Sequence, residues 1–337
     1  MREKHLLPKV SKYFKTNLHT HSTISDGTLS PEGLKKAYKD KGFQILAITD
    51  HNVIADHSAL NDPDFLMLTA AEVDYSVESG WYDTPTYHLN LIAKRADNLW
   101  LPGLPKNHSF NERNKDLIAK MHFEGVKYEY SPESINALIA RSNEMGFLVS
   151  YNHPTWSCQS YPDYAPLKGL WGMELRNSIS VECGNNDNHN ARVFKDLLNL
   201  GNNVYPIGAD DTHGSVTLGF SWIMVGAEKL SYDSVIEALE KGDFYMSCGP
   251  EIFDLTMYGS TLKISCSDAR RVSVECRGRF ADTVSAKDDK WLNKAAFDLS
   301  GFIERANGNN EEYIYLTITA PDGSYAATRA YYLNELI

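Results

Sequence analysis

Over the first 250 residues, short apolar runs alternate with stretches in which apolar residues recur every three or four positions. The short runs contain many β-branched and consecutive apolar residues, which is typical of strands covered on both faces. The alternation of such strands with helices is typical of βα units. We expect strands at 14–19, 43–51, 65–73, 86–93, 146–153, 172–177, 203–211 and 220–227.

Helix start and stop signals separate these strands. Ser30 and Ser131 each precede a proline, which places a serine at the N-cap and proline at the first helical position. Glycines follow the periodic stretches, as at Gly42 and Gly201. The segment from 94 to 130 is less regular, and we interpret it as an insertion over one face that could act as a lid. The predicted helices cover 30–42, 131–146, 188–201 and 231–242.

The pattern changes near Gly249-Pro250. Beyond this point apolar and polar residues alternate at 261–267, 271–278, 313–320 and 329–334, with turn sequences between them. This pattern predicts antiparallel strands of a small β-sandwich. We therefore expect two domains, an α/β domain over 1–250 and an all-β domain over 251–337.

Composition narrows the possible partners. Of the 337 residues, 42% are hydrophobic, and the net charge of −11 gives no general attraction to DNA or RNA. We therefore expect no long nucleic acid as ligand, although bound metal ions could still attract a small anion. Five cysteines without a C-x-x-C pair indicate a reducing compartment. No signal peptide or membrane span is recognisable, so we expect a cytoplasmic protein without a membrane partner.

Histidines and carboxylates gather at the predicted strand ends. His19 and His21 end the first strand, and residues two apart on a strand share a face. Residues at the carboxyl ends of barrel strands point into the mouth of the barrel. The other members of the set are His51, His88, His153 and His213, together with Asp26, Asp50, Glu72 and Asp211.

A single strand-end histidine is more often a core or surface residue than a ligand. Six on successive strands, each near a carboxylate, are hard to explain by packing, because a buried ionisable group needs a partner. Imidazole and carboxylate groups together bind Zn, Mn or Fe, and the absence of cysteine from the set argues against a structural zinc site. The sequence therefore predicts a cluster of transition-metal ions.

The order of the motifs HTHSTISDG, TDH, a Glu after the third strand, NHP and GADDTH resembles the PHP (polymerase and histidinol phosphatase) superfamily over residues 14–250. The resemblance implies a distorted (β/α)7 TIM-like barrel that holds two or three divalent ions (Mn, Fe or Zn). The following β-domain resembles a branch with an immunoglobulin-like C-terminal domain, which includes relatives that act on carbamate and amide bonds.

The resemblance also implies a ligand set, with a first metal on His19, His21, Glu72 and Asp211. Glu72 would bridge to a second metal. The second metal would also be bound by His88 and His153, and a third by Asp26, His51 and His213. Glu174 and Asn177, at another strand end, are interpreted as supporting residues.

We expect a metal-bridging hydroxide to attack the phosphoester of a small substrate such as a nucleotide or sugar phosphate. The proposed catalytic residues are Asp50, Asp211 and His213. Asp50 either orients His51 or shuttles a proton, or makes only a supporting hydrogen bond.

The same metal-bridging hydroxide could attack a carbamate or amide, and a basic substrate pocket would favour the phosphoester. A non-catalytic binding or assembly module is a third possibility, against which the intact ligand set counts. Amidohydrolase barrels need a metal-bridging lysine and a different histidine order. The natural substrate, the metals and the oligomeric state stay open.

Overall fold

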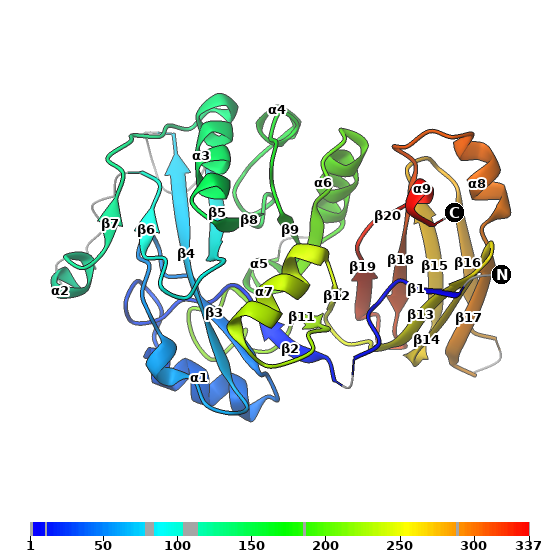
Figure 1. Ribbon diagram of the computed structural model, residues 1–337, viewed down its shortest axis with the longest axis horizontal. Coiled ribbons are helices and arrows are strands. Elements are labelled where there is room, and N and C mark those ends of the chain that lie inside the picture. The colour runs from blue at the N-terminus through cyan, green and yellow to red at the C-terminus, as the bar shows by residue number, and fades with distance from the viewer. Residues whose placement is uncertain are drawn as a thin grey trace.

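A computed structural model describes residues 3–10, 12–77, 84–103, 114–184, 187–287 and 290–336. It has a larger part, in which helices surround a sheet, and a smaller part rich in strands (Figure 1). None of the helices in these ranges is long and apolar enough to cross a membrane.

Seven strands of the larger part form one continuous arc of sheet. Their order is β10-β9-β8-β5-β4-β3-β2, and every pair is parallel except the two that involve β5. All seven lie where the apolar runs predicted them. They are β2 (Phe14–Asn17), β3 (Ile45–Ile48), β4 (Leu66–Ser76), β5 (Thr86–Ala93), β8 (Phe147–Tyr151), β9 (Gly172–Asn177) and β10 (Tyr205–Ala209).

The arc does not close into the expected barrel. Among the residues that the structure describes, β2 and β10 do not pair; past their ends, Thr20 and Thr212 form an isolated parallel bridge. There the Asp211 amide donates to the His19 carbonyl at 2.9 Å, and the His21 amide donates to the Thr212 carbonyl at 2.9 Å. The free edge of β2 instead pairs antiparallel with β11 (Trp222–Val225). The α/β class is thus confirmed, whereas a closed (β/α)7 barrel is not.

The four predicted helices are present as α1 (Pro31–Asp40), α3 (Pro132–Glu144), α6 (Asp187–Asn199) and α7 (Tyr232–Lys241). The Ser30 and Ser131 side chains accept hydrogen bonds from the first turns of α1 and α3, each at 3.2 Å, as the N-cap signals predicted. Short helical turns complete the larger part: η1 (Ser58–Leu60), α2 (Lys115–Ile118), α4 (Tyr161–Tyr164) and α5 (Ser178–Glu182).

The irregular segment 94–130 contains a two-stranded parallel pair, β6 (Trp100–Leu101) with β7 (His122–Phe123). Residues 104–113 lie outside the described residues. The interpretation of this segment as a lid therefore stays a prediction.

The smaller part is built from two sheets, as the sandwich pattern predicted. One has the order β1-β13-β14-β17, and the other contains β19-β18-β15-β16 with β20 beside β18. Apolar side chains such as Leu262, Ile264, Val274 and Leu316 belong to the core cluster of this part. Its elements are β13 (Ile252–Tyr258), β14 (Thr261–Ala269), β15 (Arg271–Cys276), β16 (Ala281–Ser285), β17 (Leu292–Asp298), α8 (Ser300–Ala306), β18 (Tyr313–Thr319), β19 (Tyr325–Thr328), β20 (Tyr331–Tyr332) and α9 (Leu333–Leu336).

The two parts share backbone hydrogen bonds. β12 (Phe244–Ser247) pairs with β11 on one side and with β19 on the other, so one sheet runs through both parts. The N-terminal strand β1 (Glu3–His5) pairs with β13 and thus belongs to the smaller part. The domain boundary at residue 250 stays a prediction, since neither the first strand nor the shared sheet follows it.

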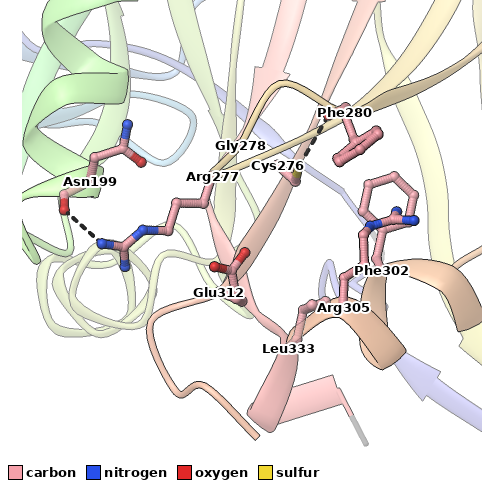
Figure 2. Close-up of a pocket in the computed structure, with 9 residues that line it drawn as sticks. All are labelled: Asn199, Cys276, Arg277, Gly278, Phe280, Phe302, Arg305, Glu312 and Leu333. Atoms are coloured by element: carbon pink, nitrogen blue, oxygen red, sulfur yellow. Dashed lines mark hydrogen bonds between the residues drawn. The ribbon is translucent and has the colours of Figure 1, made fainter. Parts of the chain in front are cut away.

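Side chains also join the parts. The Arg277 side chain donates to the Asn199 carbonyl at the end of α6, at 3.3 Å, beside a cavity of about 510 Å³ (Figure 2). Tyr313 donates to the Asn199 side chain at 2.9 Å. The cavity is lined by Phe280 and Arg305 among others, and by none of the predicted ligands.

Gly208 provides a test of this arrangement, because β10 passes close to β11 and β12 there. A Cβ at position 208 would lie 2.8 Å from the Trp222 carbonyl oxygen and 3.0 Å from Met246 Cγ. We expect Gly208→Ala to lower the free energy of unfolding by about 1–3 kcal/mol, since backbone atoms cannot yield cheaply. Urea denaturation measures this change.

Gly278→Ala is the matched control, because a Cβ at that glycine would meet nothing within 4 Å. Its effect should stay within about 0.5 kcal/mol. Equal midpoints for the two variants would contradict the close approach of β10 to β11.

Candidate metal centre

The predicted ligands converge from strands that are distant in sequence. Glu72 and His88 lie on the paired strands β4 and β5, while the others follow the ends of β2, β3, β8 and β10. The isolated bridge between Thr20 and Thr212 brings His19 and His21 beside Asp211. We call His19, His21, Glu72 and Asp211 the inner cluster; their exposed fractions are at most 6%.

The inner cluster has the spacing of ligands around one ion. The Nε2 atoms of His19 and His21 are 3.2 Å apart, and they lie 3.1 and 3.0 Å from Asp211 Oδ1. The same nitrogens lie 3.4 and 3.3 Å from the carboxylate oxygens of Glu72. Metal–ligand distances of about 2.0–2.1 Å in tetrahedral geometry separate neighbouring ligand atoms by roughly 3.3 Å. The donor atoms are therefore placed as an ion between them would require.

Two carboxylate oxygens support this fit. Glu72 Oε2 and Asp211 Oδ1 are buried and have no hydrogen-bond partner within the described ranges. A buried carboxylate oxygen without a donor is costly, and native proteins rarely contain one. A divalent cation at this position would satisfy both oxygens.

Glu72 also faces a second group of imidazoles. Its Oε1 lies 2.9 Å from His88 Nδ1 and 3.5 Å from His153 Nε2, and its Oε2 lies 3.3 Å from His51 Nδ1. Ligand atoms that lie within 4.8 Å of one another are found in two further sets. One set is His51, Glu72 and His88, and the other is His19, His153 and Glu174. Glu72 is thus placed between two sets of ligands, as a bridging role requires. Which residue binds which ion stays a prediction.

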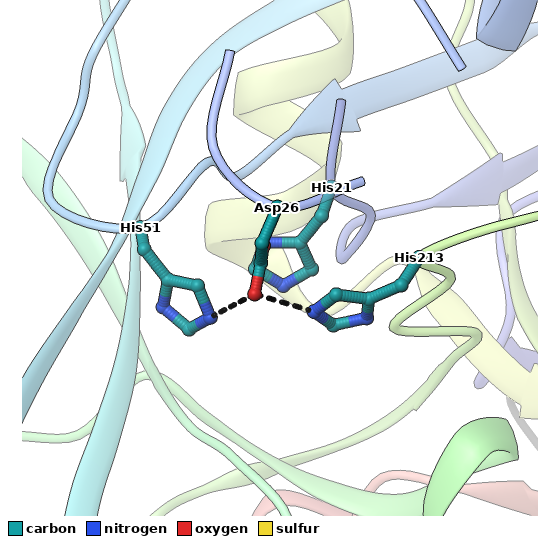
Figure 3. A group of neighbouring side chains, drawn as sticks. All are labelled: His21, Asp26, His51 and His213. Carbon is teal, nitrogen blue, oxygen red and sulfur yellow. Dashed lines mark ion pairs between the residues drawn. The ribbon is translucent and has the colours of Figure 1, made fainter. Parts of the chain in front are cut away.

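An outer group lies at the solvent side, formed by His21, Asp26, His51 and His213 (Figure 3). Asp26 lies 3.4 Å from His213 and 3.7 Å from both His51 and His21. Its side chain is 48% exposed and that of His213 is 32% exposed, in contrast to the inner cluster. The outer group is therefore the part of the centre that faces solvent.

Glu174 holds two of the histidines. Its Oε1 accepts a hydrogen bond from His19 Nδ1 at 2.7 Å, which directs His19 Nε2 into the inner cluster. Its Oε2 accepts from the His153 amide at 3.1 Å and from Asn177 Nδ2 at 2.8 Å. Asn177 also donates to Asp211 Oδ2 at 3.1 Å. Such partners orient metal ligands and raise their basicity, which agrees with the supporting role predicted for Glu174 and Asn177.

The Asp50 carboxylate is occupied by hydrogen bonds from Ser22 and Ser25. Its Oδ1 accepts from the amides of Ser22 and Ser25 at 2.8 and 3.1 Å, and their hydroxyls donate to the same carboxylate. These bonds fix the loop that carries Asp26. The hydrogen-bond geometry of Asp50 favours the supporting role over that of a proton shuttle.

Two supporting residues were not singled out from the sequence. Asn152 donates to Glu72 Oε1 at 2.9 Å, and the Ser157 hydroxyl lies 3.1 Å from His153 Nδ1. Asn152 is part of the NHP motif and could have been recognised there. Ser157 carries no sequence signal, because its role arises from a turn that follows His153.

Backbone strain is concentrated at the same place. His153 has φ of 24° and Asp211 has φ of 51°, although neither is a glycine. Such conformations cost on the order of 1–3 kcal/mol each and cluster at functional sites, where the surrounding structure enforces them. The hydrogen bonds of Glu174 and Asn177 supply that enforcement here.

One family model matches the part of the chain that contains the first motifs. The family model of the PHP domain matches residues 17–143, which include His19, His21, Asp26, His51, Glu72 and His88. This region of the chain is therefore similar to the PHP domain. His153, Asp211 and His213 lie beyond the matched segment, so their place beside it rests on the geometry. No curated protein matches the chain.

Several solved structures are similar at low identity. A two-domain protein from Bacteroides vulgatus, described as containing a predicted PHP-like metal-dependent phosphoesterase, is 14% identical, with 98% of this chain and 99% of that chain covered and a TM-score of 0.44. A lesion-specific endonuclease from Pyrococcus furiosus is 12% identical, with coverage of 68% and 56% and a TM-score of 0.37. An amidohydrolase from Chromobacterium violaceum is 16% identical, with coverage of 59% and 87% and a TM-score of 0.34. TM-scores this low support no argument about function.

The inner cluster also shapes the proton affinity of its histidines. Burial lowers the pKa of His21, but the adjacent negative carboxylates of Asp211 and Glu72 outweigh burial and raise the pKa to about 10. Burial, reinforced by the charge of His21, lowers the pKa of His51 to about 4. Without metal at neutral pH, His21 therefore carries a proton, whereas His51 is neutral.

Metal binding should release that proton, because a ligating imidazole must offer its lone pair. We expect the affinity for Mn²⁺ to rise with pH, by up to about ten-fold per unit for each proton displaced, between about pH 6.5 and about pH 8.5. Calorimetry in buffers of different ionisation heat measures the protons released. Binding without proton release and without pH dependence would contradict the protonated state of His21.

Proposed function

We propose that this chain is a metal-dependent hydrolase that cleaves a phosphoester of a small substrate. The observation that carries the proposal is the inner cluster, in which the Nε2 atoms of His19 and His21 lie 3.0–3.4 Å from carboxylate oxygens of Asp211 and Glu72. The PHP domain over residues 17–143 supports the same reading. The donor set of imidazoles and carboxylates suits two or three Mn, Fe or Zn ions.

We assign the inner cluster to a first ion, and Glu72 to a bridge toward a second ion near His88 and His153. Divalent ions at these positions would lower the pKa of a coordinated water from about 16 toward 7 and absorb charge on the phosphoryl oxygens. Asp26, His51 and His213 of the outer group are proposed as the third site.

The chain's own groups define where the substrate would bind. His213 Nδ1 donates to the Asp211 carbonyl at 3.1 Å, so its Nε2 points toward Asp26 at the open side. Without an ion at the third site, Nε2 of His213 could contact a phosphoryl oxygen or supply a proton to the leaving group; with an ion there, the same nitrogen would be a ligand. Asp211 has one oxygen held by Asn177 and one facing the histidines. We assign Asp50 to holding the loop of Asp26.

Asp211→Asn tests the proposal, because it keeps the shape of the side chain and removes its negative charge. We expect the purified variant to bind Mn²⁺ at least about 10–100-fold more weakly and to lose hydrolysis of phosphomonoesters at least about 100-fold in kcat/KM. Metal analysis and a phosphate-release assay measure the two effects.

Asp282→Asn, an exposed aspartate of β16, is the matched control and should behave like the unmodified chain. The substrate panel includes carbamates and amides, because the same ligand set can activate water toward a carbonyl. Cleavage of carbamates but not phosphoesters would replace the proposed substrate class, and undiminished turnover by Asp211→Asn would refute the site.

A further inference from the structure

One aromatic side chain beside the metal centre is exposed. Trp156 is 39% exposed, yet its indole lies 5.1 Å from the ring of His153 and 5.7 Å from that of His88, between ring centroids. Both ring pairs are close to perpendicular, at 83° and 71°. Trp156 thus contacts two proposed ligands and still keeps part of its surface toward solvent.

The turn that carries Trp156 is held from within. The amide of Ser157 donates to the His153 carbonyl at 3.1 Å, and that of Gln159 donates to the Pro154 carbonyl at 3.1 Å. Cys158 adopts φ of 56°, which bends the chain two residues after Trp156. The backbone that carries the indole is therefore held by hydrogen bonds within the turn, and the ring itself packs on His153 and His88.

The same turn is tied to two neighbouring elements. The Thr86 amide at the start of β5 donates to the Ser157 carbonyl at 3.1 Å. Thr155 donates to the side chain of Asn190 on α6 at 2.7 Å. These bonds fix Trp156 relative to His88, which lies on β5.

An exposed indole on a rigid support is suited to stacking. Tryptophan is usually highly buried, because removing its large apolar surface from water lowers the free energy. A rigid aromatic ring loses little conformational entropy when a second planar group covers it. Packing on His88 and His153 alone does not account for the surface that stays open.

We infer that Trp156 is a specificity residue, against which a planar ring carried by the substrate stacks while the reacting group lies at the inner cluster. The inference rests on the proposed function and names its substrate class, namely phosphoesters whose leaving group carries a planar ring rather than a purely aliphatic or sugar group. A nucleobase and a simple aryl group share this chemistry.

Binding of non-hydrolysable probes tests the inference apart from turnover. The dissociation constants of phenylphosphonate and methylphosphonate are measured by calorimetry on the full chain at saturating Mn²⁺, for the unmodified protein, Trp156→Leu and Trp156→Phe. The readout is the ratio of the two constants, because weaker metal binding lowers the affinity for both phosphonates alike. Trp291→Leu, another exposed tryptophan in the smaller part, is the control.

The unmodified chain should prefer phenylphosphonate. Trp156→Leu should reduce that preference by between about 5-fold and 150-fold, the range known for loss of a base–aromatic stack. Trp156→Phe and Trp291→Leu should keep most of it. With the non-hydrolysable methylenephosphonate analogue of AMP as a third ligand, a larger loss for this analogue than for phenylphosphonate identifies a nucleobase as the ring, and an equal loss identifies an aryl group.

The inference would be overturned if the unmodified chain bound both phosphonates equally well, or if Trp156→Leu left the ratio of the two dissociation constants unchanged. Trp156 would then only pack on the histidines. Ring preference without hydrolysis of any phosphoester would refute the proposed function alone. Absence of binding by either phosphonate would overturn both.

Discussion

Two buried carboxylates, Glu72 and Asp211, impose the condition on which the rest of the centre depends. Their oxygens lie among the imidazoles of His19 and His21 in the buried part of the centre. Negative charge buried in this way needs compensating positive charge, either as protons on the histidines or as metal ions between the ligands. The raised pKa of His21 and the unsatisfied carboxylate oxygens are two consequences of the same arrangement. The spacing of the donor atoms favours ions as the functional solution.

The fold maintains this arrangement by joining distant segments. The isolated bridge between Thr20 and Thr212 replaces the closed barrel seam and fixes His19 and Asp211 on either side of it. Buried Asp210 accepts hydrogen bonds from the amides of Gly219, Phe220 and Ser221, which anchors the loop that follows His213. The strain at His153 and Asp211 is tolerated because these supports leave the backbone no alternative.

Much of this could be predicted from the sequence, because the relevant signals are local. Serine caps and terminal glycines located the four main helices, and apolar runs located the strands of the arc. The pairing of β2 with β11 and of β1 with β13 could not be predicted, since both depend on contacts between distant residues. The exposed strand β16 lacks the apolar alternation by which the other strands were recognised.

The candidate ligands were recognisable because their motifs lie at strand ends in a specific order. The roles of Ser157 and Trp156 could not be predicted in the same way, because each depends on which side chains meet in space. The most direct test is anomalous diffraction from crystals grown with Mn²⁺. The account predicts a peak within bonding distance, about 2.0–2.3 Å, of His19, His21, Glu72 and Asp211. Ions bound elsewhere, with these four side chains apart, would contradict it.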